Sequence, residues 1–70
     1  MILLDVDGHL VSDTSLKELH VFADKIGLLR EWLQDHRWPH YDVWGIKRAE
    51  AVKAGAVLVD IRELLMRACK

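Results

Sequence analysis

Side chains that could bind an anion lie close together in the second half of this chain. His40, Tyr41 and Asp42 are consecutive, and the basic pair Lys47 and Arg48 follows after a short gap. The pair falls at the start of a predicted helix, where backbone N–H groups lack intrahelical partners and favour a bound anion. We expect Lys47 and Arg48 to neutralise a phosphate, and His40 and Tyr41 to donate hydrogen bonds. Asp42 would orient His40 or accept a hydrogen bond from a ribose hydroxyl.

Aromatic residues surround the same polar segment. Trp38 and Trp44 flank it, and they would either stack on a base or adenine-like ring or pack at a subunit interface. Trp32 fits a predicted strand and is expected in the core. His20 falls at the polar margin of a predicted helix. It would either cover the core or point toward the carboxyl edge of the sheet, where open α/β sheets bind ligands.

Spacing gives no support for a metal site. His36 and His40 are four residues apart, as zinc ligands on a helix would be, but Pro39 makes a continuous helix there improbable. The remaining candidate ligands lie at no recognised zinc spacing: His9, His20 and Cys69. We therefore expect no metal and no cofactor.

Size and composition describe a single domain over residues 1–70. With 70 residues, 51% of them hydrophobic, and a net charge of −1, the chain is typical of a small globular protein. The near-neutral charge argues against dedicated nucleic-acid binding. The single cysteine excludes an internal disulfide and favours a reducing compartment. No signal peptide and no apolar run near the roughly 20 residues needed to span a membrane is present, so we expect a cytoplasmic protein. A core this small favours a homo-oligomer, most simply a two-fold dimer.

Strands and helices alternate in the predicted order βαβαβα. Apolar runs at residues 2–6, 28–33 and 57–59 predict strands, and residues 34–42 are predicted as a loop. This order is typical of a small α/β domain, with a three-stranded, mainly parallel sheet joined by right-handed crossovers.

Three helices are predicted between these strands. Capping signals at Ser15 and Asp60 begin the first and the last. The middle helix covers roughly residues 44–54. Its spacing indicates that it buries a stripe formed by Ile46, Ala49 and Val52. Lys47 and Arg48 would then face solvent.

Several blocks of residues resemble the small bacterial and phage family called domain of unknown function 4031. They span about residues 3 to 60 and are specific in combination: His9-Leu10-Val11-Ser12-Asp13-Thr14, Glu18-Leu19-His20, Phe22-Ala23-Asp24-Lys25-Ile26-Gly27-Leu28, Trp32-Leu33-Gln34, Pro39-His40-Tyr41-Asp42, Lys47-Arg48-Ala49 and Ala54-Gly55-Ala56-Val57. The family carries no established activity. The resemblance supports the α/β fold and marks six positions as a site: His20, His40, Tyr41, Asp42, Lys47 and Arg48.

A shorter segment resembles a different class of protein. Asp5-Val6-Asp7-Gly8 after an apolar run is similar to the first motif of haloacid-dehalogenase-type phosphatases, where one aspartate is a nucleophile and the next a general acid. The chain has no room for the cap and the later motifs of that site. We therefore interpret this segment as a strand end that turns through Asp-Gly.

These features predict a phage or bacterial protein that binds a phosphate-containing small molecule or nucleotide without turnover. It could sequester a nucleotide signal of host defence. The first alternative is a small nuclease or phosphodiesterase, with His40 and Asp42 as a general base and Lys47 and Arg48 stabilising the transition state. The second is a protein-interaction module that uses its tryptophans to block a partner.

Overall fold

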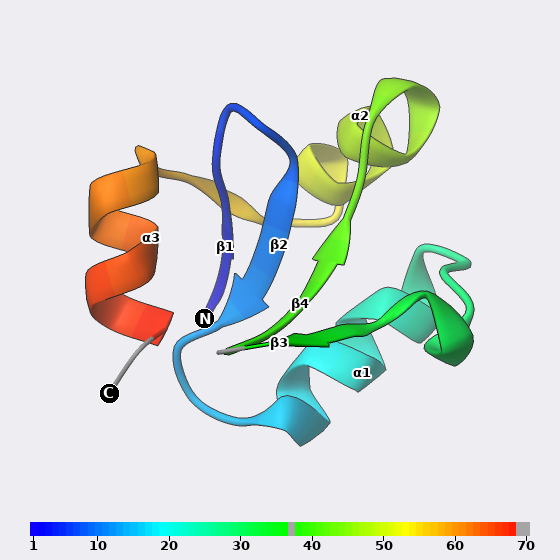
Figure 1. Ribbon diagram of the computed structural model, residues 1–70. Coiled ribbons are helices and arrows are strands. Elements are labelled where there is room, and N and C mark those ends of the chain that lie inside the picture. The colour runs from blue at the N-terminus through cyan, green and yellow to red at the C-terminus, as the bar shows by residue number, and fades with distance from the viewer. Residues whose placement is uncertain (37, 69–70) are drawn as a thin grey trace.

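The computed structural model describes residues 1–36 and 38–68, which form five strands and three α-helices (Figure 1). In chain order the elements are β1 (Ile2–Leu4), β2 (His9–Ser12), α1 (Leu16–Lys25), the short 3-10 helix η1 (Arg30–Trp32), β3 (Gln34–His36), β4 (Trp38–Asp42), α2 (Gly45–Lys53), β5 (Val57–Leu58) and α3 (Ile61–Ala68).

The five strands form a mixed sheet in the order β3-β4-β2-β1-β5. Neighbouring strands are antiparallel except β1 and β5, which are parallel. The predicted α/β class is therefore confirmed, but the three-stranded, mainly parallel sheet is wrong. The physical reason is the short connection after β1, which reverses the chain at once. The first two strands consequently form a hairpin instead of being joined by a helical crossover.

Two predictions in the middle of the chain are also wrong. Residues 34–42, predicted as a loop, contain β3 and β4, which pair with each other. Residues 28–33, predicted as a strand, contain η1. Leu28 is buried there, but Leu29 and Trp32 are both exposed, so Trp32 is not a core residue as expected. Local alternation was misleading because pairing with a neighbouring strand decides which segments become β-structure.

The three predicted helices are confirmed, and a polar side chain caps the N-terminus of two of them. The Ser15 hydroxyl accepts a hydrogen bond from the Glu18 amide at 3.1 Å at the start of α1. The Asp60 carboxylate accepts one from the Glu63 amide at 2.8 Å at the start of α3. Each contact satisfies an N–H group that has no partner within its helix. The side chain of Trp44, which precedes α2, makes no such contact.

Apolar side chains fill both faces of the sheet, with α1 and α2 on one face and α3 on the other (Figure 1). Leu4 packs with Leu19 of α1 on the first face. Leu3 and Val11 pack with Leu64 of α3 on the second. Successive strand residues point to opposite faces, so an uninterrupted apolar run supplies both cores.

Helix α2 turns a different side to the core from the one predicted. Ala51 is its buried residue, whereas Ile46, Ala49 and Val52 are exposed. The predicted inner stripe is therefore wrong. Lys47 lies one turn before Ala51 and shares its inward side.

Candidate functional site

The turn between β1 and β2 is built around the carboxylate of Asp5, which is fully buried. Its Oδ1 accepts hydrogen bonds from the backbone amides of Asp7 at 3.0 Å and His9 at 2.9 Å. Gly8 adopts a φ of +90°, which L side chains rarely adopt, and its carbonyl accepts a hydrogen bond from the Val43 amide at 2.8 Å. The Asp-x-Asp-Gly segment thus fixes the turn and the start of β2.

Asp5 also fixes the imidazole of His9. Its Oδ2 lies 2.8 Å from Nδ1 of that ring. An ionised carboxylate only accepts hydrogen bonds, so Nδ1 carries the proton and Nε2 is left for another partner. The His9 side chain is 28% exposed, which leaves the ring accessible to a ligand.

His40 and Asp42 project from β4 on one face because they are two residues apart. His40 donates from Nδ1 to the Trp38 carbonyl at 3.2 Å, and its Nε2 lies 3.5 Å from Oδ1 of Asp42. In the antiparallel pairing of β2 with β4, His9 is opposite Asp42. This register brings the His9 and His40 rings to a centroid distance of 5.4 Å, edge to face.

We call Asp5, His9, His40 and Asp42 the histidine–aspartate cluster. One potential ligand atom from each of His9, His40 and Asp42 lies within 4.8 Å of the other two. Both imidazoles donate Nδ1–H to a fixed acceptor, which leaves two Nε2 atoms and a carboxylate for a shared partner. Such a set of acceptors suits a proton or a metal cation.

His20 and Tyr41 lie on the opposite face of the sheet from Asp42. Tyr41 alternates with its neighbours along β4 and is fully buried in the core beneath α1. Its hydroxyl lies 2.9 Å from Nδ1 of His20. Burial raises the pKa of Tyr41 above its usual value. These two predicted site residues therefore hold α1 to the sheet and are separated from the cluster.

Lys47 was predicted to face solvent, but its side chain is held by contacts with other residues. Its Nζ donates to the Ile26 carbonyl at 2.7 Å and to Oε2 of Glu50 at 3.2 Å. Because Ile26 is the C-cap of α1, Lys47 ties α2 to the end of that helix. Arg48 is half-buried, and its side chain makes no hydrogen bond or ion pair with another residue in the described part of the chain.

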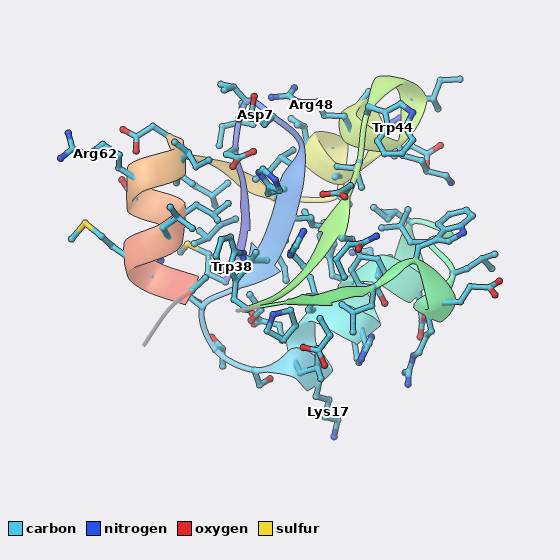
Figure 2. All side chains as sticks on the ribbon, viewed as in Figure 1. Asp7, Lys17, Trp38, Trp44, Arg48 and Arg62 are labelled. Carbon is cyan, nitrogen blue, oxygen red and sulfur yellow. The ribbon has the colours of Figure 1, made fainter. Side chains whose placement is uncertain are left out.

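A pocket of about 380 Å³ adjoins the cluster. It is lined by Leu28, Trp32, Asp42, Val43, Trp44 and Lys47. Trp32 and Trp44 are 48% and 74% exposed, and Asp42 belongs to both the pocket and the cluster. Trp38 lies elsewhere, packed against the α3 face, and its buried indole N–H has no partner among residues 1–36 and 38–68. Figure 2 shows Trp44 and Arg48 at one end of the molecule with Asp7, and Trp38 well apart from them.

Sequence reasoning missed Asp5 and His9 as companions of His40 and Asp42. The Asp5-Val6-Asp7-Gly8 segment by itself indicates only a phosphatase-like motif or a turn. The register of β2 on β4 joins the two halves of the cluster, and neither strand was predicted. Metal-ligand spacing rules apply within one continuous segment, so they cannot detect ligands that two paired strands bring together. Of the other zinc candidates, the His36 side chain and Cys69 lie outside what the structure describes.

A second polar group links the N-terminus to α1 and α3. The Met1 ammonium lies 2.9 Å from Oδ1 of Asp13 and 2.7 Å from Oε1 of Glu18. The Arg67 guanidinium pairs with the other oxygen of Asp13. The ammonium group is the main cause that holds the pKa of Asp13 and of Glu18 below their usual values. These groups are mutually paired, so we assign them a structural role.

The fold and the cluster define a small mixed α/β protein in which two histidines and two aspartates from β2, β4 and the β1–β2 turn lie together. The chain belongs to the family described as "Protein of unknown function (DUF4031)", whose model matches residues 5–70. The family predicted from the sequence blocks is thereby confirmed, and the match includes the whole cluster. Comparisons with curated proteins and with solved structures gave no match. Within the described residues, no helix is long and apolar enough to cross a membrane.

Proposed function

We propose that the protein binds a phosphate-containing small molecule with a flat aromatic ring, of which a nucleotide is the simplest example. The observation that carries this proposal is the pocket beside the cluster, whose lining includes Trp32, Trp44, Lys47 and Asp42. Its volume of about 380 Å³ falls within the range of about 300–1,000 Å³ that is usual for small-molecule sites.

Each polar or aromatic wall of the pocket suits one part of such a ligand. Trp32 and Trp44 expose indole surface on which a base can stack, an interaction typically worth about 1–3 kcal/mol per base. The Lys47 ammonium has three N–H groups, and two already have acceptors, so one remains for a phosphate oxygen. Asp42 can accept a hydrogen bond from a sugar hydroxyl. Arg48 does not line the pocket, so the phosphate contact falls to Lys47.

The test is a thermal-shift screen of linear and cyclic nucleotides, with nucleosides and inorganic phosphate in separate arms. A bound nucleotide should raise the melting temperature, because ligand binding stabilises the folded state. Trp44→Ala should weaken nucleotide affinity by about tenfold or more, given the energy of one stacked base. The matched control is Ile46→Ala, which removes a similarly exposed apolar side chain from outside the pocket.

Two results would reject this proposal. One is a wild-type protein that no nucleotide stabilises. The other is a Trp44→Ala variant that responds to nucleotide as the wild type does. Lys47→Ala is a poor test by itself, since Lys47 also holds the end of α1. If the protein is encoded by a phage or a bacterium, we propose that it sequesters a nucleotide signal.

Phosphoester cleavage is a second candidate function, favoured by the paired histidines. His9 and His40 lie 5.4 Å apart between ring centroids, and both offer Nε2. A neutral Nε2 can accept a proton from the attacking group while a protonated one donates to the leaving group. Chromatography of the same nucleotides after incubation distinguishes binding from turnover. If product forms and His40→Gln abolishes its formation, the protein is an enzyme. If the nucleotides stay unchanged, the protein binds them without turnover.

A further inference from the structure

We infer that His9, His40 and Asp42 bind one divalent transition-metal ion, and that Asp5 positions His9 for it. This inference stands on the geometry of the cluster and does not require the nucleotide pocket. No recognised spacing in the sequence predicts it, because its ligands come from two strands that meet through their register.

The first argument is the orientation of both imidazoles. His9 donates Nδ1–H to the fully buried carboxylate of Asp5 at 2.8 Å. His40 donates Nδ1–H to the Trp38 carbonyl at 3.2 Å. Histidines that bind metals almost always give their second ring N–H to a carboxylate or a backbone carbonyl, which fixes the tautomer and frees the other nitrogen. Both histidines of this cluster follow that pattern.

The second argument is that three hydrogen-bond acceptors meet with no hydrogen-bond donor between them. In its neutral form His40 presents the lone pair of Nε2 to Oδ1 of Asp42 at 3.5 Å. His9 brings a further potential ligand atom within 4.8 Å of both. Lone pairs and a carboxylate repel one another unless a cation lies between them. A divalent ion satisfies all three groups at once.

The third argument is distance. Zinc binds imidazole nitrogen and carboxylate oxygen at about 2.0–2.2 Å, so two ligand atoms of a tetrahedral site are about 3.3 Å apart. The separation of 3.5 Å between His40 Nε2 and Asp42 Oδ1 is already close to this value. The ligand atoms of the whole group lie within 4.8 Å of one another, so a bound ion would draw them closer by at most about 1.5 Å.

Asp5 acts as a positioning residue and not as a ligand. Both of its oxygens already accept hydrogen bonds, Oδ1 from two backbone amides and Oδ2 from His9. Asp5, Asp7 and His9 form an alternative ligand group, but using it would break the bonds that hold the turn. The group that leaves the turn intact consists of His9, His40 and Asp42.

The ligand set also indicates the kind of ion. Two imidazoles and one carboxylate suit zinc and similar first-row metals, whereas calcium and magnesium prefer oxygen ligands throughout. Three protein ligands leave a coordination position open. Asp42 also lines the pocket that contains Trp32 and Trp44, so the ion would help to offset the charge of a phosphate bound there. This last step alone rests on the proposed function.

The test is isothermal titration of the full chain with zinc chloride after chelator treatment, with the fold of each variant checked by circular dichroism. We expect one zinc ion per chain for the wild type. Asp42→Asn and His40→Gln should each weaken binding by more than about 100-fold, because each removes a ligand. Asp5→Asn should weaken it by about 10–100-fold, the usual effect of changing a hydrogen-bond partner of a metal ligand, while keeping the stoichiometry. The matched control is His20→Gln, which changes a histidine on the other face and should leave zinc affinity within about twofold.

Three outcomes overturn the inference: no stoichiometric zinc binding by the wild type, an affinity that Asp42→Asn leaves unchanged, or an equal loss in His20→Gln. The Asp42 side chain is 43% exposed at the end of β4, so its amide variant should keep the fold even if changes at the more buried histidines do not. Asp42→Asn therefore decides the question. A folded Asp42→Asn protein that binds zinc as the wild type does would show that His9, His40 and Asp42 do not form the metal site.

Discussion

Gly8→Ala should destabilise the protein far more than another glycine substitution with a similar backbone requirement. Gly8 has a φ of +90°, and a left-handed conformation costs an L residue about 1–2 kcal/mol. A Cβ atom at Gly8 would also lie 2.1 Å from the carbonyl oxygen of Val43, whereas ordinary contacts begin near 3.4 Å. The turn must therefore shift by more than an ångström away from the backbone of Val43.

That shift breaks the hydrogen bond from the Val43 amide to the Gly8 carbonyl, which measures 2.8 Å. Val43 is buried, and a buried amide left without its partner costs about 1–3 kcal/mol. Together with the backbone cost, the expected loss in the free energy of unfolding is about 2–5 kcal/mol. A chain of 70 residues typically has only about 4–10 kcal/mol in total, so the variant should be close to unfolding.

The control for Gly8→Ala is Gly45→Ala, at a φ of +57° with nothing within 4 Å of the added Cβ. It should lose only the backbone cost of about 1–2 kcal/mol. Urea denaturation followed by circular dichroism measures both free energies of unfolding. Equal losses in the two variants would refute the close approach between the β1–β2 turn and Val43.

Three further predictions concern packing, pH and assembly. Leu64→Ala should cost about 2–5 kcal/mol in unfolding free energy because Leu64 is fully buried on the α3 face, whereas Met66→Ala at an exposed position should change little. The pKa values of Asp13 and Glu18 are lowered in the folded state, so both carboxylates stabilise the fold fully above their unfolded pKa values of 3.8 and 4.5. This stabilisation is lost as the pH falls below those values. The urea midpoint should therefore be lower at pH 3 than at pH 6, and equal midpoints would contradict the prediction. Light scattering at micromolar concentration should give twice the chain mass of 8.1 kDa, since many large apolar side chains are exposed, and a stable monomer would contradict the expected dimer.

The helices could be predicted from the sequence because their signals are local. Ser15 and Asp60 each cap a helix with a side chain that reaches an amide three residues later. Nothing outside the segment is needed to recognise such a start. The inner side of α2 could not be predicted in this way, because Ala51 and Lys47 face inward through contacts with distant residues, including the end of α1.

The sheet and half of the site depend on contacts that are not local. The sequences of β2 and β4 contain polar residues and do not show the pattern of a buried strand. They form strands because they pair with each other, and because β2 also pairs with β1 and β4 with β3. His40 and Asp42 were predicted as site residues from their types. Their partner His9 is placed by the register of that pairing, and Asp5 joins them through its contact with His9. Alternation within a single segment does not predict that register.

The most direct test of the histidine–aspartate cluster is long-range proton–nitrogen NMR of protein labelled with ¹⁵N-histidine at pH 7.5, before and after zinc. The spectrum reports which ring nitrogen carries the proton. We predict that His9 and His40 are both protonated at Nδ1, because their acceptors are a carboxylate and a carbonyl. Zinc should then shift Nε2 of these two residues and leave His20 unchanged. A proton on Nε2 of either ring, or an equal zinc-induced shift at His20, would contradict the site.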